Sequence, residues 1–280
     1  MSLLRPHEHP EQITGPAPLV SVIVPTMNRP ELLAVALESL CQQTFRDFEA
    51  VIVNDAGKDP LPAIEPFAQC LDILYISHET NKGLSKSRNT GIRAARGRYI
   101  TYLDDDDFYY EDHIEALVNT LRQTRAAVVY ADANIALQRE ENGHFATRSR
   151  RVLYSVDFDP QRLLRENITP VLCVMHEKRC LEEVGHFREC LKALEDWDLW
   201  MRMSRFYTFV HLPFATSEYV WRKGDDTLTQ DRQAMRAAGA HLGQIGRWMA
   251  QIPRIEELRA RLGEAEIVCR APETACELSV

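Results

Sequence analysis

An alternation of short apolar runs with helical patterns, beginning near Leu19, constrains the fold of this chain more than any other feature. Residues 20–24 are mostly β-branched and lead into Pro25, which predicts a buried strand. Asn28 then supplies an N-cap and Pro30 a helix-starting proline, and the apolar residues that follow recur at the spacing of a helix. A strand followed by a helix that packs on it is therefore expected at the start of the folded region.

The same alternation continues through the first half of the chain. Further strands are predicted at residues 50–53, 73–76 and 99–103, and helices at about 84–95 and 114–121. Strands that alternate with helices favour an α/β fold with a mostly parallel central sheet flanked by helices.

The pattern loosens beyond residue 130. A polar, basic stretch at 138–151 is predicted as a mobile loop, and shorter elements are expected around 171–175 and 199–203. Residues from 231 onwards are rich in Ala, Arg, Glu and Leu and predict helices. The second half is therefore expected to be α+β with a helical C-terminal extension, and 280 residues allow one large domain or two small ones.

The charge balance argues against a nucleic-acid partner. The chain has 33 Lys and Arg against 41 Asp and Glu, a formal net charge of −8, and it has no long basic run. Binding to a polyphosphate backbone takes a basic surface that displaces counterions. A small phosphorylated ligand is compatible with this balance if local groups offset its charge.

The seven cysteines are odd in number and show no Cys-x-x-Cys pair and no matching histidine spacing. Neither a disulfide framework nor a zinc site is therefore predicted, and a reducing, cytoplasmic setting fits best. Residues 1–18 form a polar tail without an apolar core, and no segment approaches 18 consecutive apolar residues. The chain is thus predicted to be neither secreted nor membrane-spanning, while attachment to a membrane surface stays open.

Four consecutive aspartates, residues 104–107, follow the strand predicted at 99–103. In an open α/β sheet, ligands bind at the carboxyl ends of the strands. Adjacent carboxylates repel one another unless a cation or hydrogen-bond donors offset their charge, and Mg²⁺ or Mn²⁺ commonly takes one or two carboxylates together with substrate phosphates. The alternative is an acidic helix start, in which Asp107 acts as a cap. The ligand spacing of an EF-hand is absent.

A second acidic cluster, residues 195–198, lies where another helix is expected to begin. Glu195 and Asp196 are followed by Trp197 and Trp200, rings that can desolvate a carboxylate and line a sugar-sized pocket. Such a carboxylate is a candidate general base, because burial raises its pKa. The alternative is an ordinary acidic first turn of a helix with two core tryptophans.

Two weaker signals follow the second and third predicted strands. Asp55, in the stretch 53–57, is suited to accept a hydrogen bond from a nucleobase or ribose, although on its own this stretch indicates an ordinary turn. The stretch 81–91, which contains Lys82 and Arg88, is suited to hold phosphate at a helix N-terminus, or is simply a capped, solvated helix face.

Taken in order, these stretches resemble the family 2 glycosyltransferases of the GT-A fold. The resemblance spans roughly residues 19–229 and rests on VSVIVPTMNRPELL, FEAVIVNDAG, NKGLSKSRNTGIRAARGRYITYLDDDDF and EDWDLWMRM. It implies a Rossmann-like fold, a nucleotide-sugar donor, Mn²⁺ or Mg²⁺ as cofactor, and inversion at the anomeric carbon.

Carried over residue by residue, the resemblance implies roles for several positions of this chain. Asp196 corresponds to the catalytic base, with Glu195 beside it to orient the base or the acceptor. Asp106 is the first choice as metal ligand, with Asp104 as the other end of the Asp-x-Asp motif. The implied contacts to the nucleotide sugar are Pro25, Thr26, Asn28, Arg29, Asp55, Lys82, Arg88, Asp104 and Asp105. The resemblance also implies contacts to the acceptor or to the diphosphate from Trp197, Trp200, Arg222 and Lys223.

The chain also departs from the family pattern. Many relatives have a histidine near the segment 219–224, where a third metal or phosphate contact is expected, and this chain has none there. Arg222 or Lys223 would then contact the diphosphate as a substitute cation. The paired acids usual near Asp55 are reduced to Asn54 and Asp55.

These departures keep a non-catalytic nucleotide- or glycan-binding protein on the same scaffold as the alternative function. A sugar-nucleotide pyrophosphorylase is disfavoured, because its glycine-rich first loop is missing after Val24.

The resulting hypothesis divides the chain into a tail (1–18), a GT-A domain (19–230) and a helical extension (231–280). Within the domain, residues 19–107 form the nucleotide-binding half and 108–230 the acceptor-side half. The expected reaction is metal-dependent transfer of a sugar, most simply from a UDP-sugar, to a hydroxyl of a glycan, a lipid-linked or another acceptor. By family analogy, the setting is surface polysaccharide or lipopolysaccharide assembly in the cytoplasm or at the inner face of the membrane. The oligomeric state, the sugar and the acceptor are not encoded in any pattern that we can interpret.

Overall fold

The structure is a computed structural model that describes residues 5–6, 16–141, 144–153, 155–222 and 232–250. Its strands are β1 (Arg5–Pro6), β2 (Val20–Thr26), β3 (Phe48–Asn54), β4 (Asp72–Ser77), β5 (Tyr99–Tyr102), β6 (Phe108–Tyr109), β7 (Val128–Glu141), β8 (His144–Leu153), β9 (Val174–Glu177) and β10 (Phe209–Arg222). Its helices are α1 (Pro30–Cys41), α2 (Leu61–Ile64), α3 (Leu84–Ala94), α4 (His113–Thr124), α5 (Pro160–Leu163), α6 (Cys180–Val184), α7 (Glu195–Met203) and α8 (Arg232–Met249), with 3₁₀ turns η1 (Glu65–Phe67) and η2 (Val171–Cys173).

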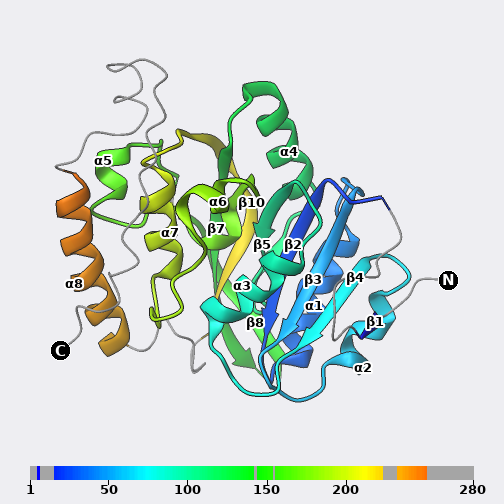
Figure 1. The fold of residues 1–280 in the computed structure, drawn as a ribbon. Helices are drawn as coiled ribbons and strands as arrows, with labels where there is room; N and C mark the ends of the chain where they lie inside the picture. Colours follow the sequence, from blue (N-terminus) through cyan, green and yellow to red (C-terminus); the bar gives the residue numbers. More distant parts are fainter. Residues whose placement is uncertain (1–4, 7–15, 142–143, 154, 223–231, 251–280) are drawn as a thin grey trace.

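Within these residues the strands form one ten-stranded mixed sheet in the order β1-β4-β3-β2-β5-β9-β7-β10-β6, with β8 paired to β7 (Figure 1). The strands β4, β3, β2 and β5 are parallel, as the alternation of strands and helices predicts. β9 runs antiparallel to both β5 and β7, and β7 is parallel to β10. The α/β fold with flanking helices is therefore confirmed, with antiparallel pairs concentrated in the second half.

Alternate residues of the central strands pack on opposite faces of the sheet. Val22 belongs to the buried apolar cluster that includes Leu37 of α1, whereas Ile23 belongs to a second cluster that includes Ile92 of α3. Helix α4 joins the first cluster, and the second cluster includes residues of α5, α6, α7 and α8. Helices thus cover both faces, which explains why these strands are apolar on both sides.

Three local predictions are wrong. Residues 138–151 are not a mobile loop, because most of them pair in the antiparallel hairpin β7–β8, whose exposed polar face hides the strand pattern. Asn28 is not the N-cap of α1, since Arg29 holds that position and the Asn28 Oδ1 accepts a hydrogen bond from the Lys58 N–H at 2.8 Å. Asp107 is not a helix cap, because β6 intervenes and α4 begins after Asp112.

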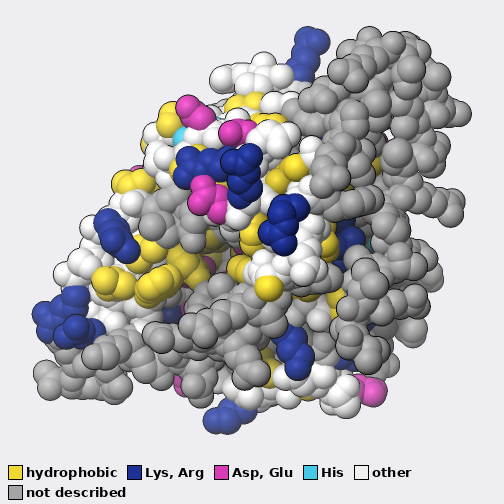
Figure 2. All heavy atoms as spheres, turned by 90° about the vertical axis from the view of Figure 1, so that its left-hand side faces the viewer, with side chains coloured by type: hydrophobic (Ala, Val, Ile, Leu, Met, Phe, Trp, Pro, Cys, Tyr) yellow, Lys and Arg dark blue, Asp and Glu magenta, His cyan; other side chains and the backbone are white. Residues whose placement is uncertain are grey.

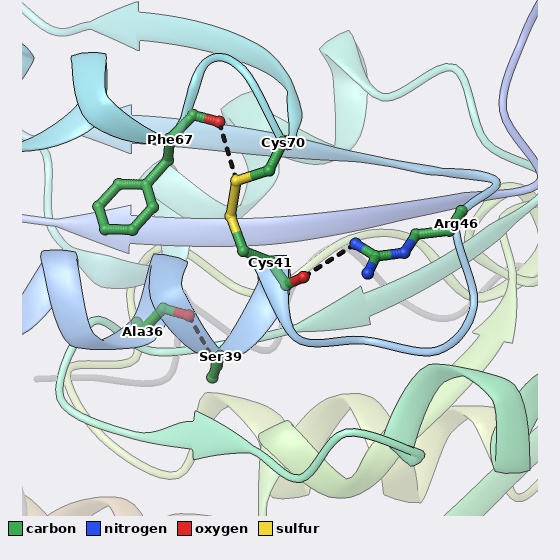
Figure 3. Close-up of a disulfide and its surroundings, with 6 residues drawn as sticks. All are labelled: Ala36, Ser39, Cys41, Arg46, Phe67 and Cys70. Carbon is green, nitrogen blue, oxygen red and sulfur yellow. Dashed lines mark hydrogen bonds between the residues drawn. A yellow bond between two sulfur atoms is a disulfide. The ribbon is translucent and has the colours of Figure 1, made fainter.

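The prediction that the cysteines are reduced is also wrong. Cys41 at the end of α1 and Cys70 after η1 form a disulfide, with Cα atoms 5.7 Å apart (Figure 3), and Cys190 is disulfide-bonded as well. Cys173 and Cys180 are free and buried. Cys41 and Cys70 are 29 residues apart and match no spacing motif, so only the packing of α1 beside η1 brings them within bonding distance.

Helix α8 packs on the side of the molecule opposite β4 and β1 (Figure 1). Leu242 is fully buried in the second apolar cluster, and Gly246 lies directly against the backbone of Leu164. Figure 2 views this side, where basic side chains lie scattered among hydrophobic ones. The helix agrees with the predicted helical extension as far as Met249. Residues 251–280 and most of the tail lie outside the described residues. The proposed domain boundaries stay predictions.

No helix in the described part of the chain combines the length and apolar character needed to cross a membrane.

Gly97→Ala should lower the free energy of unfolding by about 1–3 kcal/mol. A Cβ at Gly97 would lie 2.5 Å from the Ser21 backbone nitrogen and 2.7 Å from its Oγ, atoms that are fixed by β2 and by the Gly97 N–H to Ser21 Oγ hydrogen bond. Urea unfolding followed by circular dichroism measures the change. Gly243→Ala is the matched control, because its new Cβ meets only the flexible end of Arg247 at 3.6 Å. Equal stability of the two variants would contradict the packing argument.

Candidate active site

The loop that follows β5, residues 103–107, carries the four aspartates at the carboxyl ends of the strands and is called the aspartate loop below. The Asp107 N–H donates to the Asp104 carbonyl at 3.1 Å, which folds the loop into a turn. From the end of β2, the Thr26 hydroxyl donates to Asp105 Oδ2 at 2.7 Å. The Asp105 side chain has no exposed surface, and that of Asp106 is 15% exposed. Several carboxylates are thus held close together in a largely water-excluded place.

Arg29 supplies a positive charge to two of these carboxylates. Its Nη2 lies 2.5 Å from Asp105 Oδ1, and its Nη1 donates to Asp106 Oδ2 at 2.9 Å. Burial nevertheless raises the pKa of Asp105 to about 7, an effect that Arg29 opposes and the charge of Asp106 reinforces. Burial likewise raises the pKa of Asp106 and, well above its usual range, that of Asp107. Burial and mutual repulsion therefore disfavour full ionisation of these carboxyl groups, and added positive charge would stabilise their charged forms.

Arg88 of α3 joins the two acidic clusters, residues 104–107 and 195–198, which are far apart in the sequence. Its Nη2 donates to both oxygens of Asp104, at 2.7 and 2.8 Å, and its Nη1 donates to Glu195 Oε1 at 2.5 Å. The side chain is 1% exposed and lies over the ring of Phe187, 5.5 Å from its centroid. One guanidinium thus fixes the start of α7 against the aspartate loop.

The second carboxylate of α7, Asp196, is held in a defined orientation. Its Oδ1 accepts from the Trp197 N–H at 2.7 Å and its Oδ2 accepts from Asn167 Nδ2 at 3.0 Å. Burial, reinforced by the charge of Glu195 and opposed by Arg88, raises the pKa of Asp196 to about 7. A carboxylate with this pKa is ionised in a large fraction of molecules near neutral pH and still accepts a proton readily.

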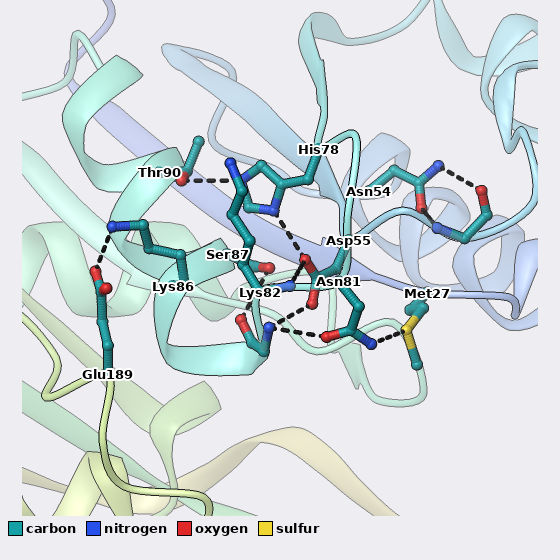
Figure 4. Close-up of polar contacts among 12 residues, drawn as sticks. Met27, Asn54, Asp55, His78, Asn81, Lys82, Lys86, Ser87, Thr90 and Glu189 are labelled. Carbon is teal, nitrogen blue, oxygen red and sulfur yellow. Dashed lines mark hydrogen bonds and ion pairs between the residues drawn. The ribbon is translucent and has the colours of Figure 1, made fainter.

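Asp55 organises the loop that leads into α3 (Figure 4). Its Oδ1 accepts from the Lys82 N–H and pairs with His78 Nδ1, both at 2.8 Å, and its Oδ2 accepts from the Gly83 N–H at 2.7 Å. Burial opposes ionisation of this carboxyl, but the hydrogen bonds from His78 and from the two amides lower its pKa overall. The carboxylate is therefore charged and rigid, and the Lys82 side chain beside it is exposed.

The remaining predicted residues differ in how they lie. Pro25 is buried in β2, and Arg222 reaches the loop, its Nη1 donating to the Asp106 carbonyl at 3.1 Å. Trp200 is fully buried in the core and Trp197 is 7% exposed, its indole N–H donating to the Leu163 carbonyl. The predicted substrate contacts of the two tryptophans therefore do not fit their burial, and the alternative of core tryptophans holds. Lys223 lies outside the described residues.

Three residues of this region were missed at the level of sequence. Asn167 holds Asp196, His78 holds Asp55, and Asn89 clamps the Phe187 backbone, donating to its carbonyl at 2.8 Å and accepting from its N–H at 3.0 Å. Asn89 follows Arg88 directly, so its place in a quoted stretch was a usable signal. His78 and Asn167 lie in segments with no recognisable pattern.

No group of three or more His, Cys, Asp or Glu side chains forms a ready-made metal site within the part of the chain that the structure describes. Instead, Asp105 and Asp106 pair with Arg29, and Asp104 pairs with Arg88. Asp107 Oδ1 accepts a hydrogen bond from the Val220 N–H at 2.8 Å. The donor set nevertheless fits Mg²⁺ or Mn²⁺, because these ions take only one or two carboxylates and complete their shell with water and phosphate. Asp106 and Asp104 retain 15% and 23% of their side-chain surface, respectively, so both carboxylates are accessible to an ion.

Comparisons with known proteins indicate one family. The model of the family described as glycosyl transferase family 2 matches residues 21–176. The uncharacterised glycosyltransferase YwdF of Bacillus subtilis is 31% identical over 218 residues, which cover 78% of this chain and 80% of YwdF. Uncharacterised glycosyltransferases of Haemophilus influenzae and Rickettsia felis are 27% and 28% identical, over 66% and 32% of their own lengths. The chain therefore spans only part of some relatives.

Two solved structures share the fold. Residues 1–349 of Staphylococcus aureus TarS, in complex with UDP-GlcNAc, superpose with a TM-score of 0.64 at 21% identity, covering 88% of this chain and 76% of that one. The mannosyltransferase PcManGT of Pyrobaculum calidifontis, in complex with GDP-Man and Mn²⁺, gives 0.55 at 20% identity, covering 92% and 67%. With more than half of the chain matched by the family model and two acidic clusters joined at the carboxyl edge of the sheet, the protein belongs to the family 2 glycosyltransferases.

Proposed function

We propose that the protein transfers a sugar from a nucleotide-diphosphate donor, a UDP-sugar, to a hydroxyl acceptor with inversion at the anomeric carbon. The observation that carries this proposal is the double contact of Arg88 with Asp104 and Glu195, at 2.7 and 2.5 Å. This contact places the aspartate loop, which is suited to bind the donor diphosphate, beside the N-terminus of α7, which carries the candidate base Asp196. The choice of uridine is supported by TarS, which was solved with UDP-GlcNAc and with UDP.

Asp196 is the proposed general base. Ionised, it takes the proton of the acceptor hydroxyl while the acceptor oxygen attacks the anomeric carbon and the diphosphate leaves from the opposite face. The hydrogen bonds from Asn167 and from the Trp197 N–H orient the carboxylate, and burial brings its pKa to about 7, where a base works well at neutral pH. Glu195 is held by Arg88 and positions the base and the acceptor.

Asp106 and Asp104 are the proposed ligands of Mn²⁺ or Mg²⁺. A bound divalent ion supplies positive charge to the departing diphosphate. Arg222, whose guanidinium already reaches the aspartate loop, stabilises the same negative charge from the protein side. The Thr26 hydroxyl fixes the side chain of Asp105 within the aspartate loop. Asp55 holds the loop that leads into α3, against which the nucleoside binds.

The proposed acceptor is a glycan or a lipid-linked hydroxyl compound, handled at the inner face of the membrane during assembly of surface polysaccharide or lipopolysaccharide. Support for this setting comes from the family resemblance alone.

A donor panel tests the reaction. Purified protein is incubated with UDP-, GDP- and dTDP-sugars, with Mn²⁺, Mg²⁺ or EDTA, and release of the free nucleoside diphosphate is measured. Metal-dependent release of UDP from one UDP-sugar is the expected result. Donor binding without release of any nucleotide, across the panel and with candidate acceptors present, would contradict catalysis.

Asp106→Asn should weaken Mn²⁺ binding in the presence of UDP by at least about tenfold, because a charged oxygen ligand is replaced by a neutral one. Titration followed by loss of the electron paramagnetic resonance signal of free Mn²⁺ measures the affinity. Asp112→Asn, which precedes α4 and makes no side-chain cap, is the control for net charge. Unchanged Mn²⁺ affinity in Asp106→Asn would remove Asp106 from the ligand set.

A further inference from the structure

Arg29 neutralises the aspartate loop from a position that it is able to leave. It lies in the connection between β2 and α1, and its guanidinium contacts Asp105 and Asp106 at 2.5 and 2.9 Å. Its side chain is 39% exposed, so one side of it already faces water. Withdrawing the guanidinium breaks two ion pairs, one with the fully buried Asp105 and one with Asp106, whose side chain is 15% exposed. Arg29 belongs to neither apolar cluster, so its withdrawal opens no core packing.

Arg88 contacts the same loop but is fixed. It is 1% exposed, makes two hydrogen bonds to Asp104 and one to Glu195, and is covered by Phe187. Moving it would leave Glu195, whose side chain is 9% exposed, and the partly buried Asp104 without this partner, which is unfavourable. Of the two guanidinium groups that pair with these carboxylates, that of Arg88 is therefore held more tightly than that of Arg29.

The two partners of Arg29 respond differently when it withdraws. Asp105 keeps the hydrogen bond from the Thr26 hydroxyl at 2.7 Å. The Asp106 carboxylate accepts a hydrogen bond from Arg29 and also interacts with the charge of Arg222, whose Nη1 donates to the Asp106 backbone carbonyl. Departure of Arg29 therefore removes a direct ion-pair partner from Asp106, the carboxylate proposed above as the main metal ligand.

We propose that Arg29 is an exchangeable counter-ion. It holds Asp105 and Asp106 while the donor is absent, and it moves to the donor diphosphate when a divalent cation takes its place on Asp106. This inference rests on the proposed function. A guanidinium suits both positions, because its planar donors pair with carboxylate and with phosphate alike.

The exchange has a thermodynamic consequence. A divalent ion that arrives alone has to displace Arg29 into water, whereas one that arrives with a nucleoside diphosphate leaves Arg29 with a new anionic partner. Metal and nucleotide should therefore bind with positive coupling, each raising the affinity of the other by the same factor. Arg29 sets the size of that factor.

The experiment measures Mn²⁺ affinity of the full chain with and without UDP, for the wild type, Arg29→Ala and Arg29→Lys, by electron paramagnetic resonance of free Mn²⁺. Arg29→Ala should bind Mn²⁺ alone about tenfold more tightly than the wild type, and the gain in Mn²⁺ affinity on adding UDP should shrink by about tenfold, within the usual range of coupling between sites. Arg29→Lys keeps the charge but not the fork of donors and should fall between the two.

The control is Arg165→Ala, which removes the same charge from an exposed position after α5 and should leave both affinities unchanged. Unchanged or weaker binding of Mn²⁺ alone in Arg29→Ala, with normal Mn²⁺ and UDP binding by the wild type, overturns the inference and leaves the proposed function intact. Absence of Mn²⁺ binding by the wild type even with UDP overturns the metal-dependent function, and this inference with it.

Discussion

Asp196→Asn should lower kcat by about 10²–10⁴-fold, the range that a positioned general base contributes. The amide keeps the size of the carboxylate and its acceptor for the Trp197 N–H, but it cannot take the acceptor proton. Donor binding should change little, because the Asp196 side chain contacts Asn167 and the Trp197 N–H and not the aspartates that are proposed to hold the donor diphosphate. Steady-state kinetics with a fixed donor, together with UDP titration, separate the two effects.

The pH profile gives this prediction an independent check. Because the base has to be ionised and its pKa is about 7, kcat/KM of the wild type should fall about tenfold per pH unit below that value. In Asp196→Asn this acidic limb should disappear, which distinguishes Asp196 from Asp105, whose pKa is raised to about the same value. Near-normal turnover of the variant, or an unchanged acidic limb, would reject Asp196 as the base.

Arg88→Met should lower the free energy of unfolding by about 3–5 kcal/mol, because it removes one partner of two buried ion pairs and leaves Asp104 and Glu195 uncompensated. The methionine fills a similar volume, so the loss is electrostatic and not a cavity effect. Chemical unfolding followed by circular dichroism measures the change, and UDP release measured below the unfolding transition should also fall steeply.

Arg93→Met is the matched control for this variant. Arg93 lies in the same helix, but it is exposed, and its hydrogen bond to Thr90 Oγ1 is long, at 3.4 Å. Its replacement should change the unfolding free energy by less than about 0.5 kcal/mol. If Arg88→Met and Arg93→Met unfold at the same denaturant concentration, Arg88 does not tie the two acidic clusters together.

The first half of the fold was predictable because its strands are buried on both faces. The β-branched runs of β2, β3 and β5 are short and are separated by helices with clear apolar stripes, which leaves few alternatives to a parallel sheet. The β7–β8 hairpin was not predicted because β8 pairs, among the described strands, with β7 alone and exposes residues such as Arg148 and Arg151. A strand with one solvent-exposed face is recognised in a sequence by its alternation of apolar and polar residues, and it resembles a polar loop where that alternation is interrupted. This hairpin has such an interruption, because its register shifts between Leu137 and Gln138.

The acidic residues of the candidate site were found from sequence, since clustered carboxylates after a strand or at a helix start need a compensating partner. Their partners were not found. Arg29 and Arg88 were assigned only to the nucleotide sugar, whereas both bind aspartates of the same chain in this structure. These contacts span 76 and 16 residues for Asp105 and Asp104, and 107 for Glu195. No local pattern encodes a distance of this kind, and the roles of these residues in turnover stay predictions.

The bridge that Arg88 forms also bears on how this enzyme is able to change over evolutionary time. One guanidinium pairs with two carboxylates, so replacing Arg88, Asp104 or Glu195 alone leaves at least one charge without its partner. The losses in unfolding free energy for replacements made in pairs should therefore not be additive. These three positions should therefore covary or stay fixed as a unit. Changes in acceptor specificity are then expected in segments outside these three positions, such as strand β8, which pairs with β7.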